Sequence, residues 1–166
     1  YKMWSGIPGN SDRKPTFGEN LTYFFKYQIN HMYWRYFMWN FAGRQNDIQS
    51  YGLNYSSYEP LAASNGTKDL IHGNWITGVD FIDSWRLGPQ KDLPAELANN
   101  KAKNRLFCLP LLLGIAGLLF QIKRSPKNAF VVFLLFFMTG LAIVLYLNQP
   151  PCQPRERDYA YAGSFY

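Results

Sequence analysis

Residues 106–122 read LFCLPLLLGIAGLLFQI, and residues 129–147 read AFVVFLLFFMTGLAIVLYL. Neither run contains a charged residue, and each approaches the ~20 apolar residues that a helix needs to cross ~30 Å of hydrocarbon. Pro110 falls in the opening turn of the first run, where no intrahelical N–H bond is lost. The two runs predict a transmembrane helical hairpin within residues 105–147, with spans at about 106–122 and 129–147.

A soluble protein with two buried core helices is the competing interpretation. The mildly negative mean hydropathy of the chain favours it. Against it, the sequence contains no other strongly apolar helix that would enclose these two. We therefore favour a mainly α, integral membrane fragment.

The orientation of the hairpin rests on its connector. Residues 123–127 read KRSPK, and by the positive-inside rule a short basic connector places the tip in the cytoplasm. Basic residues at 101, 103 and 105, and again at 155 and 157, count against this assignment. On balance we expect the loops before residue 105 and after residue 147 to lie on the non-cytoplasmic side.

Residues 148–166 follow the second span and read NQPPCQPRERDYAYAGSFY. Four consecutive charges, at residues 155–158, predict a charged external loop beside the membrane. A hairpin would bring Cys108 and Cys152 towards the same membrane face. A disulfide is open in an oxidising compartment, but two free thiols are favoured, with Cys108 as a small membrane-buried residue.

Residues 16–43 predict an aromatic-rich helix. Thr16 and Glu19 have the spacing of a capping box, and Gly43 provides a stop. An α-helical wheel places Lys26, Asn30, Asn40 and Arg44 on one stripe and Gln28, His31 and Arg35 on a nearly opposite one. Trp and Tyr favour the membrane interface, so we expect an interfacial or buried helix. A tilted transmembrane span containing Arg35 is the alternative.

His31 and Arg35 share a face of this helix at i,i+4. One hypothesis is a polar pair that contacts a phosphate or a sugar. The other, which we favour on these residues alone, is packing against the aromatic shell, including cation–π contacts.

The remaining segments are polar. Residues 1–15 predict an irregular lead-in. Residues 44–104 predict an external loop region with short helices. One of these helices starts within Leu93–Leu97, with Pro94 in its first turn. Asp80 and Asp83 lie three positions apart, a spacing that suits acid–base or metal chemistry. More often such a pair is solvated, here with Arg86 completing an ion pair, and we assign no catalysis to it.

Charge and composition limit the partners. The net charge is +6, but the basic residues are dispersed, so we expect no nucleic acid and instead membrane lipids or phosphate-bearing substrates. No metal-binding spacing occurs. The chain begins at Tyr1 and stops at Tyr166 within an aromatic-rich sequence, so we expect a piece of a longer polypeptide.

Several segments together resemble a known family. They are residues 16–21 (TFGENL), 27–47 (YQINHMYWRYFMWNFAGRQND), 73–76 (GNWI) and the tail from residue 148 (NQPP, then QPRERDYAYAGSFY). They look like the middle of a family of large multi-spanning bacterial membrane proteins of Bacteroidetes type. That family is similar to protein O-mannosyltransferases, which are glycosyltransferases of the GT-C architecture.

The resemblance implies a fragment of a bacterial inner-membrane glycosyltransferase. Its substrates would be a polyprenyl-phosphate-linked, mannose-like sugar donor and a protein or glycan acceptor at the periplasmic face, with no separate cofactor. In that architecture the catalytic carboxylate lies in the first large external loop, so we expect it outside this chain and assign no catalytic residue here.

The charged tail then gains a predicted role. Arg155 and Arg157 are the leading phosphate-binding candidates because guanidinium forks match phosphate oxygens. Glu156 and Asp158 would orient these groups or contact sugar hydroxyls, and Tyr159 and Tyr161 would stack on a sugar ring. The alternative is a self-neutralising cluster that fixes the loop. A non-catalytic membrane assembly or transport subunit remains the second functional hypothesis.

Overall fold

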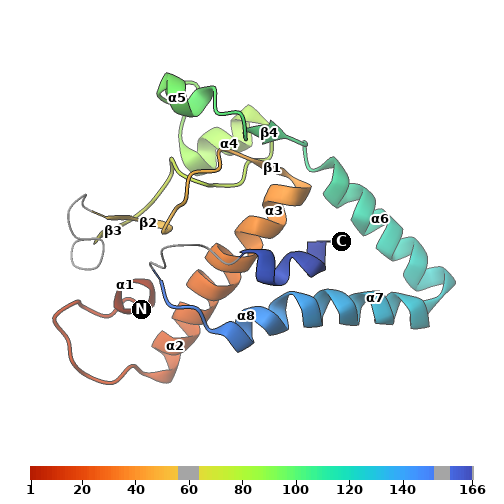
Figure 1. The fold of residues 1–166 in the computed structure, drawn as a ribbon, viewed down its shortest axis with the longest axis horizontal. Helices are drawn as coiled ribbons and strands as arrows, with labels where there is room; N and C mark the ends of the chain where they lie inside the picture. Colours follow the sequence, from red (N-terminus) through yellow and green to blue (C-terminus); the bar gives the residue numbers. More distant parts are fainter. Residues whose placement is uncertain (56–63, 152–157, 166) are drawn as a thin grey trace.

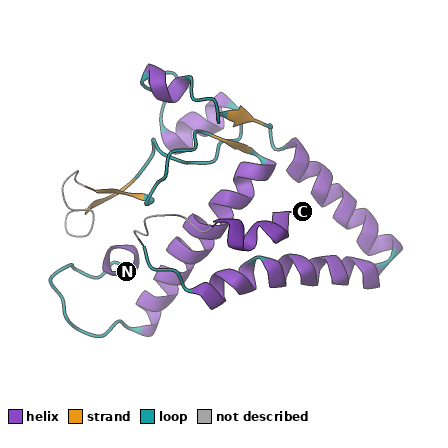
Figure 2. Ribbon diagram, in the orientation of Figure 1, coloured by secondary structure: helices purple, strands orange, loops and turns teal. Residues whose placement is uncertain are grey.

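The computed structural model describes residues 1–55, 64–151 and 158–165, and this part of the chain is mainly helical, as predicted (Figure 2). Three long helical rods form a triangular frame (Figure 1). The first covers residues 17–41, the second 109–124 and the third 126–147. A layer of short strands and helices lies beside the first rod, and the 3₁₀-helix η2 (Asp158–Phe165) lies inside the frame.

The first rod confirms the predicted boundaries of the aromatic helix. It consists of α2 (Phe17–Tyr23), the π-helix η1 (Phe24–Trp34) and α3 (Arg35–Phe41). The capping box is present: the Thr16 N–H donates to Glu19 Oε2 at 2.7 Å, and the Glu19 N–H donates to Thr16 Oγ1 at 3.4 Å. Gly43 follows the rod with φ +149°, and a Cβ there would lie 2.7 Å from the Asn104 carbonyl oxygen.

The π-helical stretch η1 was not predicted. Its hydrogen bonds run from residue i to i+5 and widen each turn, so side chains four and five positions apart share a face. The α-helical wheel used for the sequence is therefore wrong across residues 24–34. This change of register decides which side chains of the rod meet at the candidate site.

The two predicted spans form α6 (Leu109–Arg124) and the nearly continuous pair α7 (Pro126–Thr139) and α8 (Leu141–Leu147). The first helix begins at Leu109 rather than at Leu106, because Phe107 and Cys108 have positive φ angles of 54° and 56°. α6 and α7 meet at Ser125 and diverge from it (Figure 1). Within the described residues, only Pro126–Leu147, with 22 residues, is long and apolar enough to cross a membrane.

The apolar side chains of these helices are mostly uncovered. Leu113 on α6 is 73% exposed, and Phe130 on α7 is 62% exposed. The described chain thus does not enclose them in the way that a soluble core encloses its helices. This exposure, with the length of Pro126–Leu147, points to membrane association.

Residues 44–104 contain more regular structure than the predicted loop with short helices. β1 (Gly43–Arg44) pairs antiparallel with β4 (Asn104–Arg105), and β2 (Leu53–Tyr55) pairs antiparallel with β3 (Ser64–Lys68). The helices are α4 (Asp80–Leu87) and α5 (Ala95–Ala98), the latter confirming a short helix behind Pro94. In the predicted lead-in, residues 2–5 form α1 (Lys2–Ser5).

An aromatic cluster joins the first rod to the third. Its buried members are Tyr33, Tyr36, Val144 and Tyr161. Tyr161 Oη donates to the Met32 carbonyl at 2.6 Å, and Tyr33 Oη donates to Ser164 Oγ at 3.1 Å. The aromatic helix is thus buried among the chain's own elements on this face, one of the two environments predicted for it.

Candidate functional site

A cavity of about 300 Å³, with both polar and apolar lining residues, opens beside the first rod. Its lining residues come from α1, from the first rod, from the segments around β2 and β3, from the loop before α4 and from α4 itself. Figure 1 shows where these elements lie. Cations, tryptophans and small or amide residues line it: Trp4, Lys26, Asn30, His31, Trp34, Arg35, Ser50, Gly52, Leu53, Lys68, Asn74, Trp75 and Arg86. No Asp or Glu occurs among these described lining residues, so the wall is rich in positive charge. We call this the cationic cavity.

The π-helix explains how the first rod contributes five side chains to one wall. Lys26, Asn30, His31, Trp34 and Arg35 are spaced by four or five positions and all line the cavity. The prediction that Lys26 and Asn30 lie on a stripe opposite His31 and Arg35 is wrong. It assumed 3.6 residues per turn, whereas the i to i+5 pattern brings both sets to the same face.

His31 and Arg35 confirm the predicted aromatic packing and also reach the cavity. The His31 ring stacks on Tyr27, with centroids 5.7 Å apart, and the Arg35 guanidinium lies 4.7 Å from the Tyr36 ring centroid. Arg35 Nε donates to the His31 carbonyl at 3.1 Å, and its Nη1 donates to the Gly73 carbonyl at 3.2 Å. The two predicted roles, packing and polar contact, are thus compatible at this position.

Arg86 and Trp75 form the opposite wall. The Arg86 guanidinium lies 3.8 Å from the centre of the Trp75 ring, and one of its terminal nitrogens donates to the Trp75 carbonyl. Two buried donors of the lining residues, Arg86 Nε and Trp4 Nε1, have no hydrogen-bond partner among the described residues. Buried donors without acceptors are costly, so these two atoms leave hydrogen-bonding capacity unused behind the cavity surface.

The pKa values of three basic groups in the cavity are lowered, as expected for basic groups that are partly or fully buried beside like charges. Burial lowers the pKa of Arg86 to about 10, with Asp83 opposing the shift. Burial, followed by the charge of Arg86, lowers the pKa of Lys68, although much of that residue remains exposed. Burial first, then the charges of Arg35 and Lys68, lowers the pKa of His31 well below its usual value. An anion in the cavity would relieve this mutual repulsion.

The nearest carboxylates serve the scaffold. Asp69 accepts from Ser50 Oγ at 2.9 Å and lies 3.1 Å from His72 Nδ1. Asp83 is buried, and its oxygens accept from the backbone N–H groups of Thr77 and Gly78 at 2.7 and 2.9 Å. The prediction of a solvated Asp80–Asp83 pair with Arg86 is therefore wrong for Asp83, because the backbone turn at 77–78 binds it and Arg86 lies on Trp75.

Two fully buried amides hold the loop that carries Trp75. Gln45 Nε2 donates to the Leu70 carbonyl at 3.2 Å, and Asn46 Nδ2 donates to the Ile71 carbonyl at 2.8 Å. Asn46 Oδ1 also accepts from the Gly73 N–H at 2.7 Å. The sequence reasoning assigned these amides no role. The signal in the sequence that could have indicated a structural role was their position shortly after Gly43, where the helix ends.

Glycine is required at one point of the cavity wall. Gly52 has φ +76°, and a Cβ there would lie 2.6 Å from the Trp4 ring and 2.7 Å from His31 Nδ1. The chain just before β2 therefore packs directly against these two rings, an approach that any larger residue would prevent.

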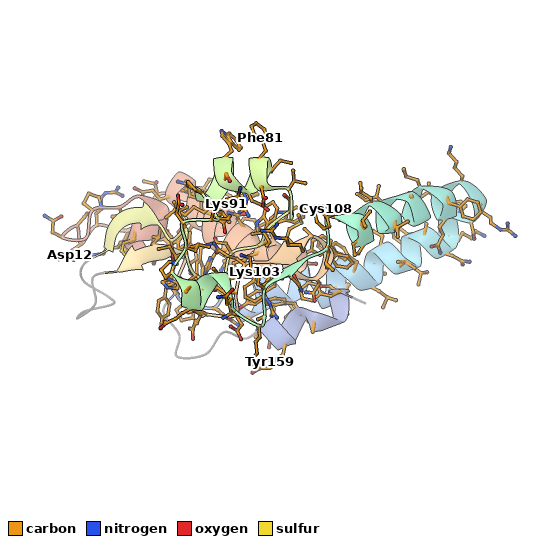
Figure 3. The ribbon with its side chains drawn as sticks, turned by 90° about the horizontal axis from the view of Figure 1, so that it is seen from above. Asp12, Phe81, Lys91, Lys103, Cys108 and Tyr159 are labelled. Atoms are coloured by element: carbon orange, nitrogen blue, oxygen red, sulfur yellow. The ribbon has the colours of Figure 1, made fainter. Side chains whose placement is uncertain are left out.

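The predicted tail site is only partly described. Arg155, Glu156 and Arg157 lie outside the described residues, as does Cys152, and Asp158 begins η2 with an undescribed side chain. The prediction that Tyr161 stacks on a sugar ring is wrong, because this side chain is 1% exposed within the aromatic cluster. Tyr159 is 62% exposed and is not among the lining residues of the cationic cavity. It projects on the opposite side of the molecule from Phe81 (Figure 3).

The described part of the chain contains neither a candidate metal site nor a disulfide. No group of three or more His, Cys, Asp or Glu residues gathers there as a metal site. Cys108 forms no disulfide with any described residue. Comparisons of the chain with protein-family models, curated proteins and solved structures find no match, so its function has to be argued from the cationic cavity itself.

Proposed function

We propose that the chain is the donor-binding part of a membrane glycosyltransferase that uses a polyprenyl-phosphate-linked sugar. The observation that carries this proposal is the cationic cavity, where four cations and three tryptophans converge without a carboxylate among the lining residues. The family resemblance of residues 27–47 and of the tail is consistent with it, and points to a mannose-like sugar.

The phosphate would bind at Arg86, Lys68 and Arg35. Arginine presents a planar fork of donors that matches phosphate oxygens, and Arg35 and Arg86 both line the cavity. A phosphodiester carries one negative charge, and the phosphate monoester that leaves after transfer carries up to two. The cations would therefore stabilise the leaving group as its charge increases.

The sugar would lie between the tryptophan faces. Trp34 is 42% exposed and Trp75 is only partly buried, so both rings are accessible from the cavity. Asn30 is exposed on the same wall and offers an amide to the sugar hydroxyls. The phosphate would thus contact the cations, and the sugar would contact the tryptophans and Asn30.

The polyprenyl chain requires a membrane beside the cavity. The rod that lines the cavity also contacts the end of the candidate span: Tyr23 Oη donates to the Gln149 carbonyl at 3.2 Å, and Gln28 Nε2 donates to Asn148 Oδ1. We propose that α6 and α7–α8 form a membrane hairpin with the basic tip at residues 123–127 in the cytoplasm. The cavity would then face the periplasm. Arg155 and Arg157, which lie outside the described residues, stay phosphate-binding candidates through the family resemblance.

Binding in a lipid nanodisc tests the proposal. Polyprenyl-phosphate mannose with a short prenyl chain is titrated into the reconstituted chain while the fluorescence of the cavity tryptophans is followed. We expect saturable quenching, and Arg86→Gln should weaken binding about tenfold or more, because a hydrogen bond to a charged group contributes roughly 1.5–3 kcal/mol. Arg124→Gln, an exposed arginine at the far end of α6, is the matched control.

Equal affinity for the uncharged prenyl alcohol, or equal weakening by both arginine variants, would contradict the proposal. The second hypothesis, a non-catalytic subunit, is separated from it by turnover. In the protein that contains this chain, transfer of the sugar should fall with Arg86→Gln, whereas a subunit without catalysis would show lipid binding and no transfer.

A further inference from the structure

Helix α4 carries an apolar ridge that no other described part of the chain covers. Phe81 and Trp85 are 83% and 86% exposed, and Val79 and Ile82 extend the same surface at 44% and 43%. Phe81 projects outward from α4 at the edge of the molecule (Figure 3). Two such aromatic rings in one eight-residue helix form an exposed apolar patch that calls for a binding partner.

The opposite side of α4 fixes the helix in place. Asp83 is 3% exposed and holds the turn at Thr77 and Gly78, while Leu87 is 5% exposed. Arg86 anchors the helix to Trp75. These contacts hold one side of α4 against the rest of the chain. The other side, which carries the ridge, is therefore left exposed.

The ridge continues into the start of the apolar helix α6. A Cβ at Gly78, just before α4, would lie 3.1 Å from the Phe107 ring and 3.2 Å from Arg105 Cβ. Asp80 and Arg105 form an ion pair at 3.1 Å. Phe107 is itself 53% exposed, so the apolar surface runs from α4 towards the helices that we assign to the membrane.

Basic side chains border the same surface. Phe81 and Trp85 share a hollow of about 590 Å³ with Lys91 and Arg105, which are both exposed. Lys101 and Lys103 follow in the segment that leads to β4. Aromatic rings beside lysine and arginine suit the boundary between anionic headgroups and acyl chains.

We infer that α4 is an interfacial anchor, with Phe81 and Trp85 inserted at the headgroup level of an anionic bilayer and Lys91 and Arg105 contacting lipid phosphates. This inference rests on the membrane association in the proposed function. It concerns a different surface from the cationic cavity and a different ligand, namely the bilayer itself.

Fluorescence quenching by brominated lipids tests the anchor. The chain is reconstituted into vesicles of phosphatidylcholine with phosphatidylglycerol, with bromine placed near the glycerol end of the acyl chains. The contribution of each tryptophan is obtained by subtracting the signal of Trp85→Phe or Trp75→Phe from that of the unmodified chain. Trp75 is the matched control because it lines the cationic cavity and not the ridge. We expect the Trp85 component to be quenched roughly twofold or more relative to the Trp75 component.

Two further variants test the lipid charge and the fold. Lys91→Gln with Arg105→Gln should reduce Trp85 quenching in phosphatidylglycerol vesicles and leave it unchanged in phosphatidylcholine alone. Phe81→Ser should reduce Trp85 quenching without changing the helical circular dichroism signal, since Phe81 makes no contribution to the described core.

The outcomes separate the anchor from the membrane assignment. If the chain floats with vesicles but Trp85 is quenched no more than Trp75, the anchor is overturned and the membrane assignment stands. If Trp85 is instead shielded from aqueous quenchers as protein concentration rises, the ridge binds a second copy, and the anchor is again overturned. A chain that does not float overturns both proposals.

Discussion

The first rod and the α6–α8 helices have opposite relations to the rest of the chain. The rod is rich in aromatic residues with polar ones between them, and one face of it buries even polar side chains: Arg35 is 5% and Gln28 is 6% exposed. The α6–α8 helices are almost purely apolar, yet they are exposed. Hydropathy alone would predict the reverse for a protein in water. The difference indicates that the buried face of the rod belongs to the chain's own core, whereas the exposed apolar helices point to membrane association.

Removing a side chain from the aromatic cluster shared by the first rod and the third should have the largest effect on stability. Tyr161→Ala should destabilise the chain by about 3–5 kcal/mol, because a 1% exposed ring is replaced by a cavity and its hydrogen bond to Met32 is lost. Tyr146→Ala, at an 88% exposed tyrosine on α8, should change stability by less than about 0.5 kcal/mol. Urea unfolding in detergent measures both, and similar losses would mean that α8 has a buried outer face.

Two glycines allow packing on the buried and the exposed sides of the apolar helices to be compared directly. A Cβ at Gly140 would lie 2.6 Å from Tyr33 Oη and 2.8 Å from Ser164 Cβ, whereas nothing lies within 4 Å of one at Gly117. Gly140→Val should therefore cost about 1–3 kcal/mol through overpacking. Gly117→Val should be tolerated. A Gly117 variant as damaging as the Gly140 variant would contradict the exposed surface of α6.

The buried face of the rod should also make stability depend on pH. Because the pKa of His31 is lowered in the folded state, the unfolded chain binds the proton more readily. The associated stability is present above the usual histidine pKa of about 6.5 and is lost as pH falls below it. His31→Gln should flatten that part of a stability–pH profile, and an unchanged slope would show that His31 is accessible to water.

The smallest expected effect concerns the exposed start of the rod. Arg13 and the Thr16 backbone lower the pKa of Glu19 to about 2, with the Arg13 hydrogen bond as the larger cause. This stabilisation is present above about pH 4.5 and is lost as pH falls towards 2. Thr16→Ala should cost about 1 kcal/mol through loss of the cap, measured as helix fraying by hydrogen exchange at residues 17–20. Uniform exchange changes along the whole rod would contradict a local role.

Local signals explain what the sequence predicted correctly. The capping box at Thr16 and Glu19 and the stop at Gly43 depend on neighbouring backbone groups, so sequence spacing is sufficient to find them. The apolar helices followed from composition, although the start of α6 depended on the φ angles of Phe107 and Cys108, which no periodicity encodes.

The cationic cavity depends on contacts that are distant in sequence. Gln45 and Asn46 hold the loop that leads to Trp75, and Arg86 lies against that ring. A two-residue strand such as β1 carries no hydrophobic pattern. Lys26 and Arg35 share a wall because η1 is a π-helix, a rare conformation that an α-helical wheel excludes in advance. His31 and Arg35 could be singled out from the sequence, whereas Lys68, Trp75 and Arg86 could not.

Photo-crosslinking tests the central claim, that the cationic cavity holds a lipid-linked phosphate, most directly. A polyprenyl-phosphate mannose analogue with a diazirine on its first isoprene unit is irradiated in nanodiscs with the chain, and labelled peptides are mapped by mass spectrometry. We predict labels on peptides that contain Trp34, Lys68 or Arg86, lost on competition with unlabelled donor and in Arg86→Gln. Labels confined to residues 91–105 or to the connector at 123–127, with none at the cavity, would contradict the account.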